Sequence, residues 1–152
     1  MLKLKVTNNA DAEWNTRLKN SNLATIYQTS VWGNLLSNSN RKCDFLQFLD
    51  EQGKVVAQTL LFISQTFGKN PFMKALGNKI KRPICTWSYG PIIFQEKFSQ
   101  DILSLLIDYL IEKNYKIIGV GHPLLPYFEI QNKKIEFIKW ITFLIDLNNS
   151  TE

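Results

Sequence analysis

The sequence predicts a single mixed α/β domain, with one sheet of parallel and antiparallel strands flanked by helices. Three observations support this prediction. Two apolar, strand-like segments follow one another around a Gly-containing turn at residues 51–53, as in an antiparallel hairpin. A long amphipathic pattern at residues 99–113 leads into an apolar strand pattern, as in the crossovers that join parallel strands. A length of 152 residues, 45% of them hydrophobic, allows one sizeable core.

Composition excludes several classes of protein. The net charge of +5 is moderate, and surface lysines account for it as readily as an anionic ligand would. No stretch approaches the roughly 20 apolar residues of a membrane-spanning helix, and residues 1–5 read as a strand rather than a signal peptide. Cys43 and Cys85 lack any CxxC or Cys/His spacing. We therefore expect a cytoplasmic protein with reduced core cysteines, no membrane span and no metal.

The amino-terminal part predicts a strand and two short helices. Residues 2–6 alternate apolar side chains with lysines, which indicates a strand with one solvated face. Asp11 is placed to cap a helix in which Trp14 and Leu18 share one side. A second helix is expected to be capped by the Thr-Ser pair at 29–30. Its apolar residues are Trp32, Leu35 and Leu36.

The middle of the chain predicts three strands. Residues 43–50 and 54–67 flank the turn, and the second segment is apolar enough to be a central strand buried on both faces. Residues 67–82 contain glycines, a proline and a cluster of bases, which indicates a loop. A further strand is expected at 83–89, ending where Gly90-Pro91 interrupts the pattern.

The carboxyl-terminal part predicts a helix and two more strands. The helix from Ser99 places one apolar stripe toward the core and ends near Asn114. Residues 115–121 form a nearly continuous apolar strand that closes at His122-Pro123. A last strand is expected at 135–147, before polar residues. The stripe consists of Ile102, Leu103, Leu106, Ile107, Leu110 and Ile111.

This order of elements is that of a GNAT-type (acyl-CoA N-acyltransferase-like) fold, and three stretches resemble one family. They are the Gln28-x-x-x-Trp32 pattern, residues 87–93 with their aromatic-x-x-Gly-Pro-aliphatic pattern, and the strand at 140–147. Together they resemble the amino-terminal GNAT-like domain of the FemAB-type peptidoglycan aminoacyltransferases. The resemblance implies that residues 1–147 are the amino-terminal half of such an enzyme. Residues 148–152 would then be a polar tail or the start of a linker to a second GNAT-like half.

The resemblance also implies a reaction and partners. Enzymes of this family add amino acids from aminoacyl-tRNA to peptidoglycan precursors, so this domain would bind an acceptor amine on a cell-wall precursor or sugar. Aminoacyl-tRNA or another acyl donor would come through the second half. The implied substrate-binding residues are Gln28, Trp32, Trp87, Tyr89, Gly90, Pro91 and His122. No catalytic residue is assigned, because the sequence offers no nucleophile for a covalent intermediate.

Three positions depart from the family pattern. Tyr89 precedes Gly-Pro where relatives often have a basic residue, residues 34–36 contain no lysine, and His122-Pro123 replaces an Asp-Pro. His122 is the single histidine; its ordinary pKa suits a general base, but a structural or surface role is the alternative. The four tryptophans are expected mainly in the core, with Trp87 and Tyr89 on one strand face either packed or lining a pocket.

Two other functions remain open at this point. A free-standing acetyl-CoA-dependent N-acetyltransferase needs a glycine-rich turn that presents amides to a pyrophosphate at a helix amino terminus. Residues 68–77 and 119–121 lack that spacing, so we expect no cofactor. The other alternative is a non-catalytic binding or interaction domain with a degenerate GNAT fold. An apolar surface left by an absent second half would also favour a homodimer.

Overall fold

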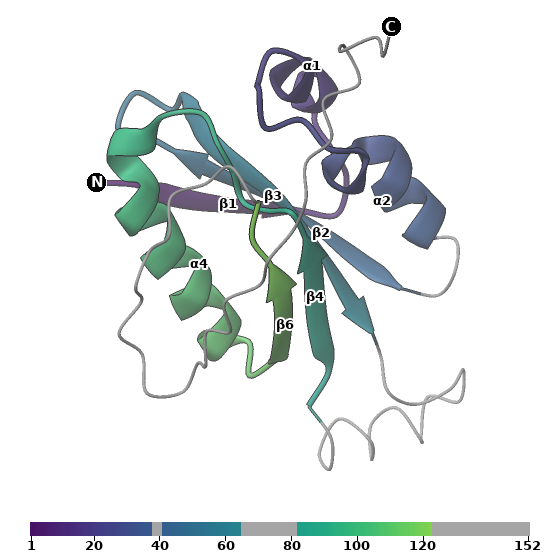
Figure 1. Cartoon of the computed structure of the whole chain (residues 1–152). Coiled ribbons are helices and arrows are strands. Elements are labelled where there is room, and N and C mark those ends of the chain that lie inside the picture. Colours follow the sequence, from purple (N-terminus) through teal and green to yellow (C-terminus); the bar gives the residue numbers. More distant parts are fainter. Residues whose placement is uncertain (38–40, 65–81, 123–152) are drawn as a thin grey trace, which may run out of the picture.

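The computed structural model describes residues 1–37, 41–64 and 82–122, and these form one mixed sheet between two helical layers (Figure 1). The strand order is β1-β2-β3-β4-β6, with β5 paired to β3 beside that path. Among the described strands, β4 and β6 are parallel and the other pairs are antiparallel. The strands are β1 Lys3–Thr7, β2 Lys42–Leu49, β3 Val55–Ser64, β4 Ile84–Ser88, β5 Ile92–Ile93 and β6 Lys116–Val120.

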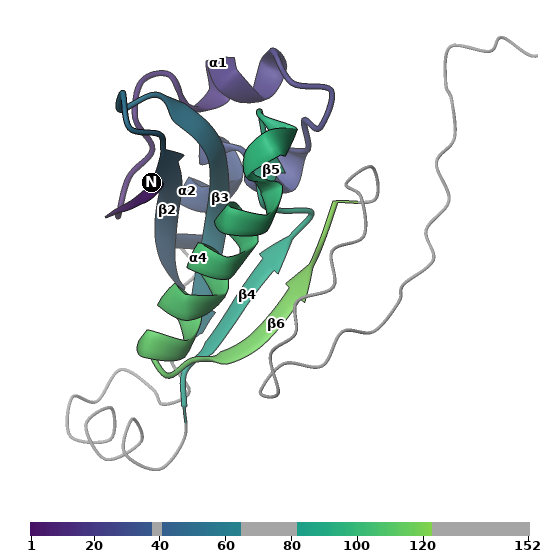
Figure 2. The ribbon, with the colours of Figure 1, turned by 90° about the vertical axis from the view of Figure 1, so that its left-hand side faces the viewer.

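Helices cover the two faces of the sheet. One face carries α1 and α2, and the other carries α4, as the two ribbon views show (Figure 1, Figure 2). The helices are α1 Trp14–Lys19, α2 Ser30–Ser37 and α4 Ser99–Glu112, with short 3-10 helices η1 Ile26–Gln28 and η2 Glu96–Phe98.

The predicted hairpin and crossover are confirmed. β2 and β3 pair antiparallel around the turn at 51–53, and residues 56–63 of β3 are buried, as expected for a central strand. The chain then runs from β4 through α4 to β6, which pairs parallel to β4 in register from Ile84–Lys116 to Ser88–Val120. The strand expected at 135–147 and all but the last residue of the loop expected at 67–82 lie outside the described residues.

The core has two parts, one on each side of the sheet. Beneath α4, the core contains Leu46 and Phe48 of β2 together with Ile102, Leu106 and Leu110. The apolar stripe predicted for α4 is confirmed, since four of its six residues are buried: Ile102, Leu106, Ile107 and Leu110. Leu103 and Ile111 are only partly buried. Beneath α1 and α2, the core contains Trp14, Leu18, Phe45, Leu60 and Phe62.

Gly33 brings α2 close to the sheet. A Cβ atom at this position would lie 2.7 Å from the Phe45 ring. Because such a distance is shorter than any normal contact, only glycine lets the helix approach β2 this closely. Trp32 and Leu36 of the same helix pack against the core that contains Phe45.

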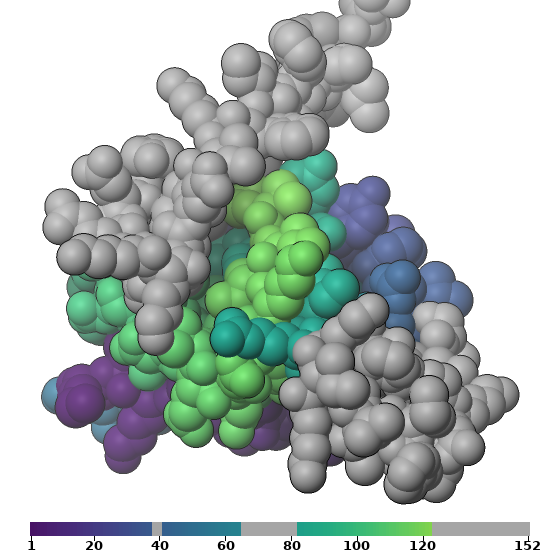
Figure 3. Space-filling model, turned by 90° about the horizontal axis from the view of Figure 1, so that it is seen from below, coloured from purple at the N-terminus to yellow at the C-terminus, as the bar shows by residue number. Residues whose placement is uncertain are grey.

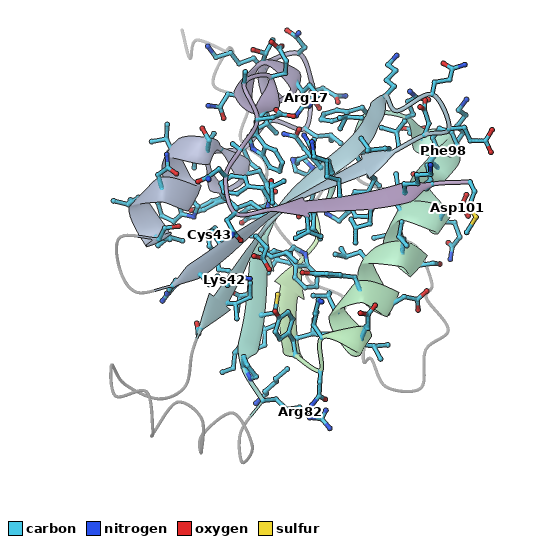
Figure 4. All side chains as sticks on the ribbon, turned by 180° about the vertical axis from the view of Figure 1, so that it is seen from behind. Arg17, Lys42, Cys43, Arg82, Phe98 and Asp101 are labelled. Carbon is cyan, nitrogen blue, oxygen red and sulfur yellow. The ribbon has the colours of Figure 1, made fainter. Side chains whose placement is uncertain are left out.

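A buried carboxylate lies in the core beneath α4. Lys42 Nζ is 2.9 Å from Asp44 Oδ1 in an ion pair without hydrogen-bond geometry, and the Tyr109 hydroxyl donates to Oδ2 at 3.3 Å. Burial, reinforced by the Asp44 charge, raises the pKa of Tyr109 far above its ordinary value. The same two causes raise the pKa of the Cys85 thiol to about 12. Lys42 and Cys43 mark the start of β2 in Figure 4, at the opposite end of the sheet from the hairpin.

One local prediction is wrong, and two further details were not predicted. Asp11 does not cap α1 with its side chain; it accepts hydrogen bonds from Arg17 and Gln47 instead. Between the Gly90-Pro91 turn and the long helix α4, the chain forms β5 and η2. The strand at 116–120 forms as predicted but is largely exposed, and Figure 3 shows it at the molecular surface. A run of apolar residues predicted the strand but not its place at the edge of the described sheet.

Candidate functional site

The candidate site lies where the parallel strands β4 and β6 end. Ligands of α/β proteins commonly bind at the carboxyl ends of such strands. After Ser88 the chain turns through Tyr89 and a cis Gly90-Pro91 peptide before it enters β5. The Gly90 N–H donates a 3.3 Å hydrogen bond to the Val120 carbonyl, so the two strands remain joined past the last pair of their ladder.

The Gln28 side chain closes the gap that this turn leaves in the sheet. Along β3, Ala57 and Gln58 pair with β5, and the residues from Phe62 onward pair with β4. Residues 59–61 lie between these two pairings and face the turn. Gln28 is fully buried there; its Nε2 donates to the Ser88 carbonyl and its Oε1 accepts from the Leu60 N–H, both at 2.8 Å. A carboxamide offers donors and an acceptor, as a peptide group does. The side chain therefore replaces a missing piece of strand.

Two further contacts hold the turn in place. A Cβ atom on Gly90 would lie 2.6 Å from Thr59 Oγ1 and 2.9 Å from Gln28 Nε2, so this position requires glycine. On the outer side, Trp14 Nε1 donates to the Gln28 carbonyl at 2.8 Å and fixes the backbone of η1. The turn and η1 are thus built as one unit from segments far apart in the sequence.

Four rings form a row over this unit, which we name the aromatic row: Trp32, Tyr27, Tyr89 and His122. Trp32 and Tyr27 meet edge to face with their centroids 5.3 Å apart. Tyr27 and Tyr89 follow at 5.5 Å, and Tyr89 and His122 at 6.5 Å. The row joins η1 and α2 on one side to the ends of β4 and β6 on the other. Three residues predicted for the site are thereby brought together.

Tyr89 reaches the row through an unusual backbone conformation. Its φ of 54° lies in the left-handed region, which costs a non-glycine residue about 1–2 kcal/mol. Strain of this kind concentrates at binding and catalytic sites, where the surrounding structure maintains it. Here the Gly90–Val120 hydrogen bond and the Gln28 bridge hold the backbone on either side of Tyr89. The conformation directs the Tyr89 ring toward Tyr27.

His122 supplies the titratable nitrogen of the row. It follows β6 and is partly buried, and this burial lowers its pKa below the ordinary value. The imidazole is therefore neutral at pH 7 and able to accept a proton.

Trp87 lies behind the turn, which corrects the expectation that it shares a strand face with Tyr89. Its ring packs against the core beneath α4, and its Nε1 donates to the Gly90 carbonyl at 3.1 Å. The indole lies directly over Gly119 of β6, where an added Cβ would be 2.0 Å from a ring carbon. Tyr89 departs from this face because its left-handed φ breaks the alternation of the strand.

The predicted site residues therefore divide into two groups. Trp32, Tyr89 and His122 belong to the aromatic row, whereas the others shape and support the turn beneath it. Tyr27 was missed, although it adjoins Gln28 in the sequence. Thr59 was also missed; among the described residues its buried hydroxyl has no hydrogen-bond partner.

Two further features are absent from residues 1–37, 41–64 and 82–122. These ranges hold no group of three His, Cys, Asp or Glu side chains arranged to bind a metal ion. None of the helices within them is both long and apolar enough to cross a membrane.

Comparison with known proteins identifies the fold. No protein-family profile and no curated protein sequence matches the chain. Among solved structures, a ribosomal-protein-alanine N-acetyltransferase from Brucella melitensis biovar Abortus 2308 is similar with a TM-score of 0.50 and 10% identity. The alignment covers 96% of this chain and 99% of that one. An acetyltransferase of Trypanosoma brucei aligns with a TM-score of 0.45 and 13% identity over 90% and 100% of the two chains.

At these identities the likeness establishes the fold alone. The chain has the GNAT-like fold, a mixed sheet flanked by helices, as its sequence predicts.

Proposed function

We propose that this chain is the acceptor-binding, GNAT-like domain of a FemAB-type acyl- or aminoacyltransferase that forms amide bonds on a cell-wall or sugar-linked amine. The hydrogen bond from Gln28 to Ser88 is the observation that carries the proposal. It joins the Gln28-x-x-x-Trp32 pattern to the Gly90-Pro91 turn, the two described stretches on which the family resemblance rests.

The proposed reaction is attack by the acceptor amine on an activated acyl carbonyl. The nitrogen–carbon bond forms, the bond to the ester oxygen or thioester sulfur breaks, and the proton lost by the amine ends on the leaving group. The protein contributes chiefly by aligning the two reactants and stabilising the oxyanion. The aromatic row supplies flat ring faces on which an acceptor can pack, beside an imidazole that can accept a proton.

The acyl donor is proposed to come from a second GNAT-like half. The surroundings of α4 support a donor site elsewhere, because Glu96 lies in η2 and Asp101 in the first turn of α4. Acidic side chains near a helix amino terminus compete with an anionic group such as pyrophosphate for the same positive end.

A free-standing N-acetyltransferase is the second candidate. The Brucella structure favours it, since that single chain is covered over 99% of its length. This candidate requires acetyl-CoA to bind the present chain by itself. Calorimetry with acetyl-CoA distinguishes the two: micromolar binding favours the second candidate, and no measurable heat favours the first.

Acceptor binding tests the first candidate directly. Amine-bearing cell-wall precursors and amino sugars would be titrated into the protein, with the resonances of its single histidine as the reporter. We expect shifts at His122 that disappear in Tyr27→Ala, which removes the middle of the row. Asn34→Ala, an exposed change on α2, is the matched control and should bind as the unaltered protein does. Unchanged His122 resonances with every acceptor would reject this assignment of the site.

A further inference from the structure

Helix α2 exposes a row of aliphatic side chains on its outer side. Ile26 of the preceding η1 is 64% exposed, Val31 70% and Leu35 58%. The inner side of the same helix is also apolar, with Trp32 and Leu36 packed against the core. Exposed aliphatic side chains that gather into a patch commonly mark a surface that a partner covers. The outer row is therefore a candidate binding surface.

A groove adjoins this row. It lies between α1 and the segment from η1 to α2, measures about 600 Å³, and has a mostly apolar lining. Ile26 and Val31 line it from one side, Leu18 and Lys19 from the other. A concave apolar groove accepts protruding side chains, as in helix-in-groove recognition, whereas a flat bilayer surface would leave it unfilled.

Basic residues predominate in the part of the sequence that lines the groove. Between Glu13 and Asp44 the sequence contains no acidic residue and has four basic ones. Two of these are already neutralised, since Arg17 pairs with Asp11 and Lys42 with Asp44. The other two, Lys19 and Arg41, are exposed and form no ion pair with any residue that the structure describes.

These two bases flank the aliphatic row. Lys19 borders the groove near the start of α2, and Arg41 follows shortly after its end, at the beginning of β2. The eight residues of α2 span about 12 Å, a little over two helical turns. The surface thus has an apolar centre and a positive charge toward each end.

We propose that this α2 surface, formed by Lys19, Ile26, Val31, Leu35 and Arg41, binds an acidic amphipathic peptide segment of a partner protein. The apolar side chains of the segment enter the groove and lie along Val31 and Leu35, and its carboxylates meet Lys19 and Arg41. Charge complementarity selects an acidic occupant, and interface centres are typically depleted of charge, as this one is. The inference is independent of the acyl-transfer proposal and concerns a different face of η1 and α2 from that used by the aromatic row.

A model peptide provides the test. The probe is a fluorescent helical peptide of about 15 residues, with leucines on one side and glutamates on the other. Two matched peptides replace either the glutamates by lysines or the leucines by glutamines. Fluorescence anisotropy should show the Leu/Glu peptide binding roughly tenfold more tightly than either control, with an affinity that falls as salt rises.

Variants assign the binding to this surface. Val31→Asp and Lys19→Glu should each weaken the Leu/Glu peptide by roughly tenfold. Lys54→Glu, an exposed charge reversal at the hairpin beyond the other end of β2, should have no effect. Circular dichroism checks that each variant is folded, which is expected because the altered side chains are exposed.

Four outcomes would overturn the proposal. The first is equal binding of the lysine peptide, and the second is peptide binding that neither variant weakens. The third is self-association that Val31→Asp abolishes, which would indicate a second copy of this chain as the occupant. The fourth is Val31-dependent binding to phosphatidylserine-containing vesicles without peptide binding, which would indicate a membrane surface.

Discussion

Gln28 donates a 2.8 Å hydrogen bond from its carboxamide to the carbonyl of Ser88, 60 residues later in the chain. The same carboxamide accepts from the Leu60 N–H, so it links β3 to the end of β4 at a point where these two strands do not pair with each other. A side chain in this position lets the chain turn at Gly90-Pro91 without leaving buried peptide groups unpaired. The Gly90-Pro91 turn then places Tyr89 in the aromatic row.

Gln28→Ala should destabilise the protein by about 3 kcal/mol. The change leaves the Leu60 N–H and the Ser88 carbonyl buried without partners, at about 1–3 kcal/mol for each group. Urea unfolding followed by tryptophan fluorescence measures the loss. Asn34→Ala is the exposed control and should change stability by less than about 0.5 kcal/mol. A loss for Gln28→Ala as small as that of the control would contradict the bridging role.

Gln28→Glu should be destabilising at neutral pH and less so in acid. The neutral carboxyl can donate to Ser88 and accept from Leu60, whereas the ionised form cannot donate. Burial raises the folded-state pKa of the introduced carboxyl above its unfolded value of about 4.3. Its bridging contribution is thus fully present below that value and is lost as the pH rises through the folded pKa. A stability difference from the unaltered protein that does not narrow on acidification would contradict this.

Gly119→Ala should cost about 3 kcal/mol, because the new methyl group would overlap the Trp87 indole. Trp87→Ala alone should also destabilise, through lost packing and the lost bond to the Gly90 carbonyl. The double variant should be more stable than the sum of the single losses predicts, since removing the indole makes room for the methyl group. Strictly additive losses would show that the two residues are not in contact.

His122 should make stability rise with pH below neutrality. Burial lowers its native pKa below 6.5, the ordinary value retained in the unfolded chain. Between the two pKa values the unfolded state binds more protons, so unfolding becomes less favourable as the pH increases through that window. Comparing the unaltered protein with His122→Asn isolates this slope from that of the carboxylates. A native histidine pKa above 6.5, measured by NMR titration, would contradict the burial.

Both cysteines should resist thiol reagents until the protein unfolds. Cys85 is fully buried with a pKa of about 12, and the Cys43 thiol donates to the Gly33 carbonyl at 3.3 Å with a pKa that burial also raises. The thiolate is the reactive form, so both features suppress reaction. A chromogenic disulfide reagent should label both cysteines completely in denaturant. Without denaturant, it should label neither cysteine within minutes. Rapid labelling of the native protein would place a cysteine at the surface.

Sequence periodicity was sufficient for most of the fold. The alternation of residues 43–50, the long apolar strand after it and the stripe of the helix from Ser99 predicted the hairpin, the central strand and the crossover. Thr29 was also expected as a helix cap, and its hydroxyl does accept from the Trp32 N–H at 3.2 Å. These features depend on local spacing, which a single sequence contains.

The arrangement of the site depended on contacts that spacing does not reveal. Gln28 was expected among substrate-binding residues, but its exposed fraction is 0%, and in the structure it positions the turn. Tyr27 escaped notice because its neighbours in the row come from distant elements. Trp87 and Tyr89 separated because a left-handed φ at Tyr89 broke a strand pattern that predicted a shared face.

We propose that this domain holds an acceptor amine for acyl transfer and depends on a second half for the donor. We would measure amide formation by residues 1–152 alone, and then with a separately produced second GNAT-like half of a FemAB-type transferase added in trans. Donors would be aminoacyl-tRNAs and acyl-CoAs, and acceptors would be amine-bearing cell-wall precursors and amino sugars. We expect no turnover by the chain alone and turnover on adding the second half, since aligning two bound reactants supplies up to about 7–11 kcal/mol of the barrier. Turnover by residues 1–152 alone would contradict it.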